Sequence, residues 1–134
     1  MPTITINTKE YHYDESQIIN FTEGLIGMPE LRRAVLIPMD DYAPFCWLAS
    51  VDGDKPQFIV VDPHQVFSGY ERPALNGSGA AHINTLAIVK ISSDWEKTTV
   101  NLRAPILINA ETRRGAQLVL SDSKYQFAEA LPQS

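Results

Sequence analysis

The sequence predicts an all-β protein, a small single-domain β-barrel or sandwich of about nine short, mostly antiparallel strands. Runs rich in β-branched and aromatic residues recur along the chain, and turn signals separate them at intervals of about 8–12 residues. Several runs, such as FIVV and LAIV, are apolar at successive positions, which is typical of strands covered on both faces or curved around a tight barrel. With 134 residues, we expect one domain over 1–134 that ends in a mobile tail over 127–134.

The first half of the chain contains five predicted strands. The alternation in TITIN (residues 3–7) and the short apolar stretch QIINF (17–21) predict the first two. A loop containing Gly24 and Pro29 follows, and we expect a helical turn over 30–33. Three stronger strands are predicted over 34–39, 45–51 and 57–62. Asp52 and Gly53 mark the hairpin between the last two of them.

The second half begins with an irregular stretch over 62–84, in which Asp62 is predicted to cap a short helical turn that runs through Phe67. The remaining strands are predicted over 85–92, 97–102, 105–109 and 116–121. Residues 109–115 would then connect two apolar strands. We expect Gly115 to supply backbone freedom there, and Arg113 and Arg114 to point to solvent.

The charge of the chain is acidic and unevenly distributed. The formal net charge is −5, and residues 1–62 carry ten acids against four bases. Because an acidic surface repels phosphates, we expect no direct binding of nucleic acid and favour a basic protein as the partner. A single cysteine, Cys46, excludes an internal disulfide framework. The first residues lack a signal pattern and no run approaches a membrane span, so we expect a cytoplasmic location without membrane contact.

No pattern in the sequence indicates catalysis, a cofactor or a metal. The three histidines share no ligand spacing, and neither a Gly-x-Ser-x-Gly elbow nor a phosphate-binding Walker loop is present. The composition favours a binding module. Two alternatives remain open: a small β-barrel hydrolase or isomerase, and a nucleic-acid-binding barrel with a basic aromatic face. The enzyme would need a pocket that contains at least two of Asp62, His64, Arg103 and Arg114 with perturbed pKa values.

Four blocks of the sequence, in order, resemble the flagellar assembly factor FliW family. They are INFTEGLIGMPELRRAVLI, PFCWLASVDGDKPQFIVVDP, FSGYE, and VNLRAPILIN followed by RRGAQLVL, and together they span most of residues 18–125. The resemblance implies a small β-barrel-like regulator that is not an enzyme. It would bind CsrA, a basic RNA-binding translational regulator, away from its RNA surface and so relieve repression of flagellin mRNA. It would also bind flagellin, in a mutually exclusive way, and thereby couple flagellin synthesis to export.

The residues that would contact these partners are a separate hypothesis, based on charge and on position in predicted loops. Acids beside strand ends are one group, and a mixed polar and aromatic patch is the other, because an exposed tyrosine beside carboxylates is a plausible anchor. The candidates are Asp40, Asp41, Asp52 and Asp54, together with Asp62, Phe67, Tyr70 and Glu71.

Overall fold

The structure, a computed structural model, describes residues 2–6, 8–52, 57–70, 82–120 and 124–132. They form eleven strands and three short 3-10 turns. The strands of the first half are β1 (Thr3–Ile6), β2 (Lys9–His12), β3 (Ile19–Phe21), β4 (Arg33–Pro38), β5 (Cys46–Ser50) and β6 (Gln57–Val61). Those of the second half are β7 (Ile83–Lys90), β8 (Thr99–Val100), β9 (Ile106–Asn109), β10 (Arg114–Gln117) and β11 (Glu129–Ala130). The turns are η1 (Glu15–Gln17), η2 (Pro63–Gln65) and η4 (Trp95–Lys97).

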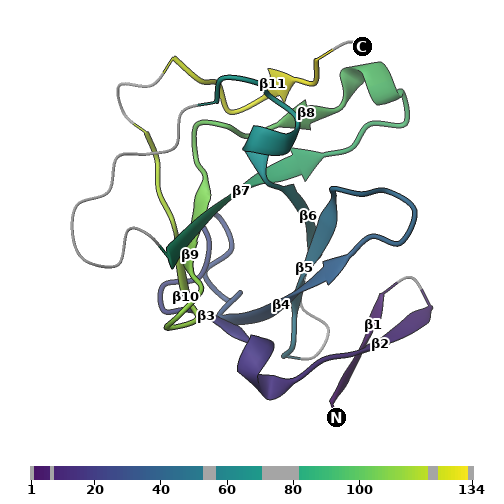
Figure 1. The fold of residues 1–134 in the computed structure, drawn as a ribbon, viewed down its shortest axis with the longest axis vertical. Helices are drawn as coiled ribbons and strands as arrows, with labels where there is room; N and C mark the ends of the chain where they lie inside the picture. The colour runs from purple at the N-terminus through teal and green to yellow at the C-terminus, as the bar shows by residue number, and fades with distance from the viewer. Residues whose placement is uncertain (1, 7, 53–56, 71–81, 121–123, 133–134) are drawn as a thin grey trace.

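Seven strands close into a barrel. Their order is β7-β6-β5-β4-β3-β10-β9, and β9 pairs back to β7 over four residues, from Ile83 with Asn109 to Leu86 with Ile106. The ring is visible in Figure 1, with the β1–β2 hairpin outside it and β8 and β11 above the far end of β7. Every pairing is antiparallel except that of β3 with β10. The predicted all-β, mostly antiparallel barrel is therefore confirmed.

Three apolar clusters hold the fold together. The first joins side chains from β3, β4, β5, β6 and β9, so it fills the inside of the ring, and Phe21 and Leu48 are fully buried in it. The second fixes the β1–β2 hairpin against β4 and β5 through Ile6, Val35 and Ile37. The third lies between η2, β7 and the C-terminal segment. Burial of these side chains supplies most of the stability of a barrel with so many short strands.

Some segments differ from their prediction. The helical turn expected over 30–33 is wrong, because Arg33 already begins β4, where it pairs with Asn20. The strand β2 is not predicted from the sequence, because KEYH (residues 9–12) shows no clear alternation of apolar and polar residues. It forms by pairing with β1. Within the tail expected to be mobile, β11 pairs with β8 and Leu131 packs on the third cluster. A two-residue strand is too short to produce a periodic signal in the sequence.

The hairpin around Gly115 also differs from its prediction. Gly115 and Arg114 lie inside β10, not in the connection before it. A Cβ atom on Gly115 would lie 2.4 Å from Cε1 of the buried Phe21, so a glycine is needed there for close packing. Arg113 takes the left-handed backbone conformation, with φ +59°, and its guanidinium donates to the Gln17 carbonyl at 2.6 Å. Of the two arginines only Arg114 is exposed as expected, because Arg113 is half-buried.

Candidate protein-binding surface

Two loops that are far apart in the sequence form one exposed apolar surface. The first loop joins β4 to β5, and the second joins β7 to β8. Together they line an open hollow of about 280 Å³. We call this the aromatic surface, and it consists of Met39, Tyr42, Phe45, Ile91 and Trp95.

Main-chain hydrogen bonds fix the shape of the β4–β5 loop. The Met39 N–H donates to the Phe45 carbonyl at 3.0 Å, which closes the base of the loop. Within it, the Tyr42 N–H donates to Met39 at 3.2 Å and the Phe45 N–H donates to Tyr42 at 2.8 Å. Because these bonds tie both ends of the loop together, Tyr42 is held at its tip with its side chain 65% exposed.

Side-chain caps shape the β7–β8 loop. The Asp94 carboxylate accepts from the Glu96 N–H at 3.2 Å and caps η4, as short polar side chains commonly do. The Ser92 N–H donates to the hydroxyl of Thr98 at 3.1 Å, and Thr98 is fully buried. The buried Thr98 thus anchors the loop to the core, and Trp95 lies on the outside of the turn, 53% exposed.

An edge-to-face contact joins the two loops. The rings of Phe45 and Trp95 lie 6.0 Å apart at an interplanar angle of 87°, a favoured arrangement for aromatic pairs. Phe45 also packs on the third apolar cluster, so the contact connects the exposed tryptophan to the core. Exposed tryptophan and tyrosine around an apolar hollow are typical of protein-binding surfaces.

Acidic side chains lie beside the aromatic surface. Asp40 forms an ion pair with Lys9 of β2, and it also accepts from the Tyr11 hydroxyl at 3.4 Å. The hydrogen bond and charge of Lys9 lower the pKa of the Asp40 carboxyl. Asp41 is exposed at the next position, and Asp94 and Glu96 are exposed on the other loop. The surface therefore combines an apolar centre with an acidic margin.

The other candidate acids are not gathered here. Asp52 follows the opposite end of β5, where it accepts from the Arg33 guanidinium at 3.0 Å. Asp62 follows β6 and caps η2 by accepting from the His64 N–H at 2.9 Å, which confirms its predicted capping role. The turn it caps is shorter than predicted, since η2 ends at Gln65. Asp54 and Glu71 lie outside the described residues.

In the described part of the polar and aromatic patch expected around Tyr70, the two aromatic side chains are buried or half-buried. Tyr70 is only 3% exposed, and its ring packs 4.9 Å from that of Tyr125 and 5.4 Å from that of His64. Phe67 is half-buried against the same cluster. Both side chains therefore contribute to the third apolar cluster, because the η2 turn folds them onto β7, and neither offers the exposed anchor that the sequence suggested.

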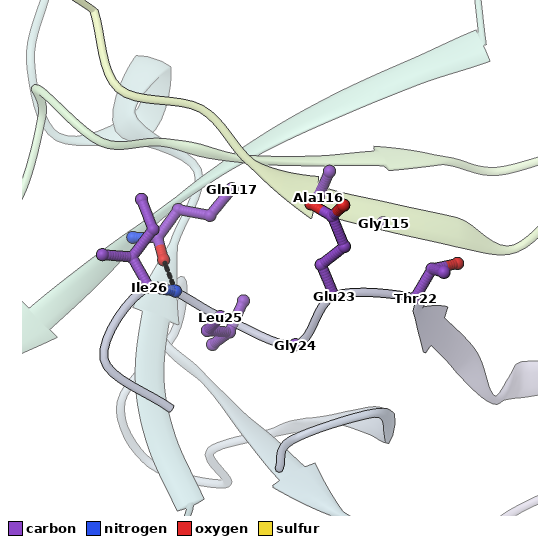
Figure 2. A pocket seen from close by; sticks show the side chains of 8 residues that line it. All are labelled: Thr22, Glu23, Gly24, Leu25, Ile26, Gly115, Ala116 and Gln117. Carbon is purple, nitrogen blue, oxygen red and sulfur yellow. Dashed lines mark hydrogen bonds between the residues drawn. The ribbon is translucent and has the colours of Figure 1, made fainter. Parts of the chain in front are cut away.

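A second hollow, of about 310 Å³, lies between the segment after β3 and strand β10. It is lined by Thr22, Glu23, Gly24, Leu25, Ile26, Gly115, Ala116 and Gln117 (Figure 2). Neither hollow is lined by any of the four residues that the enzyme alternative requires. In the described part of the chain, these two hollows thus provide no support for that alternative.

The same residues also bear on nucleophilic and metal chemistry. Cys46 is half-buried, and burial raises the pKa of its thiol, which opposes the thiolate that a nucleophile needs. No group of three or more His, Cys, Asp or Glu side chains that could hold a metal occurs among the described residues. In the same ranges, no helix has the length and apolarity to cross a bilayer.

The aromatic surface was largely missed by sequence reasoning. Asp40 and Asp41 were selected, but Tyr42 beside them and Trp95 in a predicted turn were not. The only available signal was the presence of large aromatic residues in predicted turns, and it does not separate exposed residues such as Trp95 from buried ones such as Tyr70. What the sequence could not indicate is that the two turns meet.

Comparisons with known proteins give a consistent result. The FliW protein family model matches residues 3–131. The flagellar assembly factor FliW of Clostridium beijerinckii is 33% identical over 129 residues, which cover 91% of this chain and 92% of that protein. That of Caldanaerobacter subterraneus is 36% identical over 131 residues, covering 90% and 87%. A crystal structure of the flagellar assembly factor FliW superposes with a TM-score of 0.85 at 25% identity, covering 99% of both chains.

Proposed function

This chain belongs to the FliW family of flagellar assembly factors, and on that premise we propose that it regulates flagellin synthesis by binding two proteins. It binds CsrA away from the RNA surface and thereby relieves repression of flagellin mRNA. It also binds flagellin, and the two partnerships exclude one another. Export of flagellin then frees the chain to bind CsrA in the cytoplasm.

The observation that supports this proposal most strongly is the aromatic surface. Three of its side chains, Tyr42, Ile91 and Trp95, are each more than 40% exposed, and large apolar side chains in that state are stabilised by burial against a partner. Trp and Tyr are also the residue types that most often dominate binding energy at protein interfaces. We therefore assign the main contact with CsrA to this surface.

The acidic margin supports a basic partner. Asp41, Asp94 and Glu96 are exposed around the apolar centre, and the chain carries a net charge of −5. Charges at the rim of an interface mainly accelerate encounter and set its salt dependence, whereas the apolar centre supplies affinity. We therefore expect the exposed acids to set the rate of association and the apolar centre to set the affinity.

The proposal is tested by measuring the affinity of the chain for CsrA and flagellin from the same cell. We expect binding at micromolar concentration or tighter in low salt, and competition between the two partners. Trp95→Ala should weaken CsrA binding by about tenfold or more. Phe127→Ala is the matched control, because Phe127 is 54% exposed against 53% for Trp95 and lies outside the aromatic surface.

Two results would contradict the proposal. If neither partner binds the unmodified chain, the regulatory role fails as a whole. If both bind but Trp95→Ala and Phe127→Ala have equal effects, the function stands and the aromatic surface loses its assigned contact. Circular dichroism of both variants establishes that the barrel is intact.

A further inference from the structure

We propose that the strand edge beside the second hollow accepts an extended peptide segment of a partner protein, as an added strand along residues 117–119. This site differs from the aromatic surface in position and in the groups that it presents. The inference goes beyond the function proposed above and does not depend on it.

One edge of the β10 segment is fully occupied by β9. The ladder from Arg114 to Gln117 continues past the strand, where the Leu118 N–H donates to Pro105 at 3.0 Å and the Leu120 N–H donates to Arg103 at 2.9 Å. In an antiparallel ladder, alternate residues turn their main-chain groups to opposite edges. The N–H and C=O groups of Gln117 and Val119 therefore face away from β9.

The opposite edge loses its neighbour after two residues. The parallel strand β3 pairs with β10 only through Asn20 with Arg114 and Phe21 with Gly115. Beyond Phe21 the chain turns away, with the Gly24 N–H donating to Phe21 at 3.0 Å. Among the described residues, no backbone hydrogen bond reaches the main-chain groups of Gln117 or Val119 on this edge. Within the described part of the chain, the result is a short strand edge without a pairing partner.

The turn away from β10 is fixed by Gly24. Its φ is +68°, and a Cβ atom there would lie 2.3 Å from the Pro29 carbonyl oxygen, so another side chain would be strained and would clash. Figure 2 shows the segment after Gly24 passing below β10, with the Ile26 N–H held by the Gln117 side chain at 2.8 Å. The Gln117 amide also donates to the Ala104 carbonyl at 3.0 Å. These bonds hold the hollow open.

The side chains around the edge define the occupant. Ile26, Leu118 and Val119 are 59%, 40% and 45% exposed, so they favour apolar side chains on the added strand. Glu23 extends across the hollow toward β10 in Figure 2, and among the described residues that line the hollow it is the one ionisable side chain. We therefore infer an extended segment with β-branched residues at alternate positions and one lysine or arginine near Glu23. Main-chain hydrogen bonds would supply affinity, as in other cases of strand addition.

The test uses the full chain, labelled with ¹⁵N, and a synthetic peptide of about nine residues that alternates Val and Thr around a central Lys. We expect the amide signals of Gln117 and Val119 to shift and to exchange more slowly with solvent when the peptide is bound. The same peptide with N-methyl groups on alternate residues should not bind, because it cannot form the ladder. If the unmodified peptide causes no change at these amides at millimolar concentration, the edge is only solvated and the proposal is overturned.

Two variants separate strand addition from a side-chain contact. Val119→Pro removes a main-chain N–H that faces away from β9, at an edge position where proline is tolerated, and it should weaken peptide binding by about tenfold. Val119→Ala keeps that N–H and should weaken binding only a few-fold. Equal losses in the two variants would contradict strand addition. Glu23→Gln should weaken the lysine peptide by about two- to fivefold and leave a threonine-centred peptide unchanged.

Discussion

The two hollows of this molecule are similar in size but opposite in construction. The aromatic surface, of about 280 Å³, presents side chains carried by two loops. The hollow beside β10, of about 310 Å³, presents main-chain groups that no described strand pairs with, because β3 stops early. The properties of the aromatic surface therefore depend on which side chains its loops carry, whereas those of the hollow beside β10 depend on the order and length of the strands. Substitutions should therefore affect the two regions in different ways.

The largest expected effect concerns the topological region. Gly115→Ala places a methyl group 2.4 Å from the Phe21 ring, which is fully buried in the barrel. We expect a loss of about 1–3 kcal/mol in the free energy of unfolding, because overpacking forces the ring and β10 apart. Chemical denaturation measures this loss. Ala116→Val is the control, since Ala116 is the next residue of the same strand and is exposed.

A smaller effect is expected from the contact between the two loops. The Phe45–Trp95 pair should contribute about 0.5–1.5 kcal/mol beyond the area it buries. A double-mutant cycle with Phe45→Leu and Trp95→Ala, measured by denaturation, isolates this coupling. Additive losses would show that the loops are positioned independently. In that case the aromatic surface would not be preformed.

The acidic margin should influence the rate of binding more than its strength. Asp41→Lys should slow association with CsrA a few-fold and flatten its dependence on salt. Asp52→Lys carries the same charge change to the other end of β5 and also disrupts the pair with Arg33. We expect it to have the smaller effect on the association rate. The reverse order, measured by stopped flow, would move the acidic contact away from the aromatic surface.

The smallest effect concerns the pair between Asp40 and Lys9. The folded-state pKa of Asp40 is lowered, so its contribution to stability is present above the ordinary value of 3.8 and is lost as the pH falls through the folded value. Asp40→Asn should therefore unfold slightly more easily than the original chain at neutral pH, and this difference should disappear as the pH falls through the folded-state pKa of Asp40. Because the pair is exposed, the difference at neutral pH should be small and should shrink in high salt. A difference that persists in acid would exclude the ion pair as its cause.

The sequence predicts local structure well where the residues themselves carry the signal. The apolar runs of β5, β6 and β9 and the cap at Asp62 were all located. The end of β9 is equally local, because the Asn109 side chain accepts from the N–H groups of Glu111 and Thr112 at 2.9 and 3.0 Å. These features depend on neighbours only a few residues away.

Features that require distant contacts could not be predicted. Gly115 was interpreted as a flexible turn residue because its actual constraint, the Phe21 ring, lies 94 positions earlier in the chain (115 minus 21). Tyr70 was considered as an exposed anchor because nothing local shows that η2 folds it onto Tyr125. For the same reason the meeting of Phe45 and Trp95 is absent from the sequence pattern. Each case is decided by a contact between segments that are distant in the sequence.

The single parallel pairing of the barrel has a consequence for synthesis of the chain. It joins Asn20 to Arg114, so the ring cannot close until most of the polypeptide has left the ribosome. A nascent chain that ends before β10 still has β3 as an open edge. Because pairings between distant segments form slowly, we expect closure to be the late step of folding. Partner recognition beside β10 would thus begin only after translation of the barrel is complete.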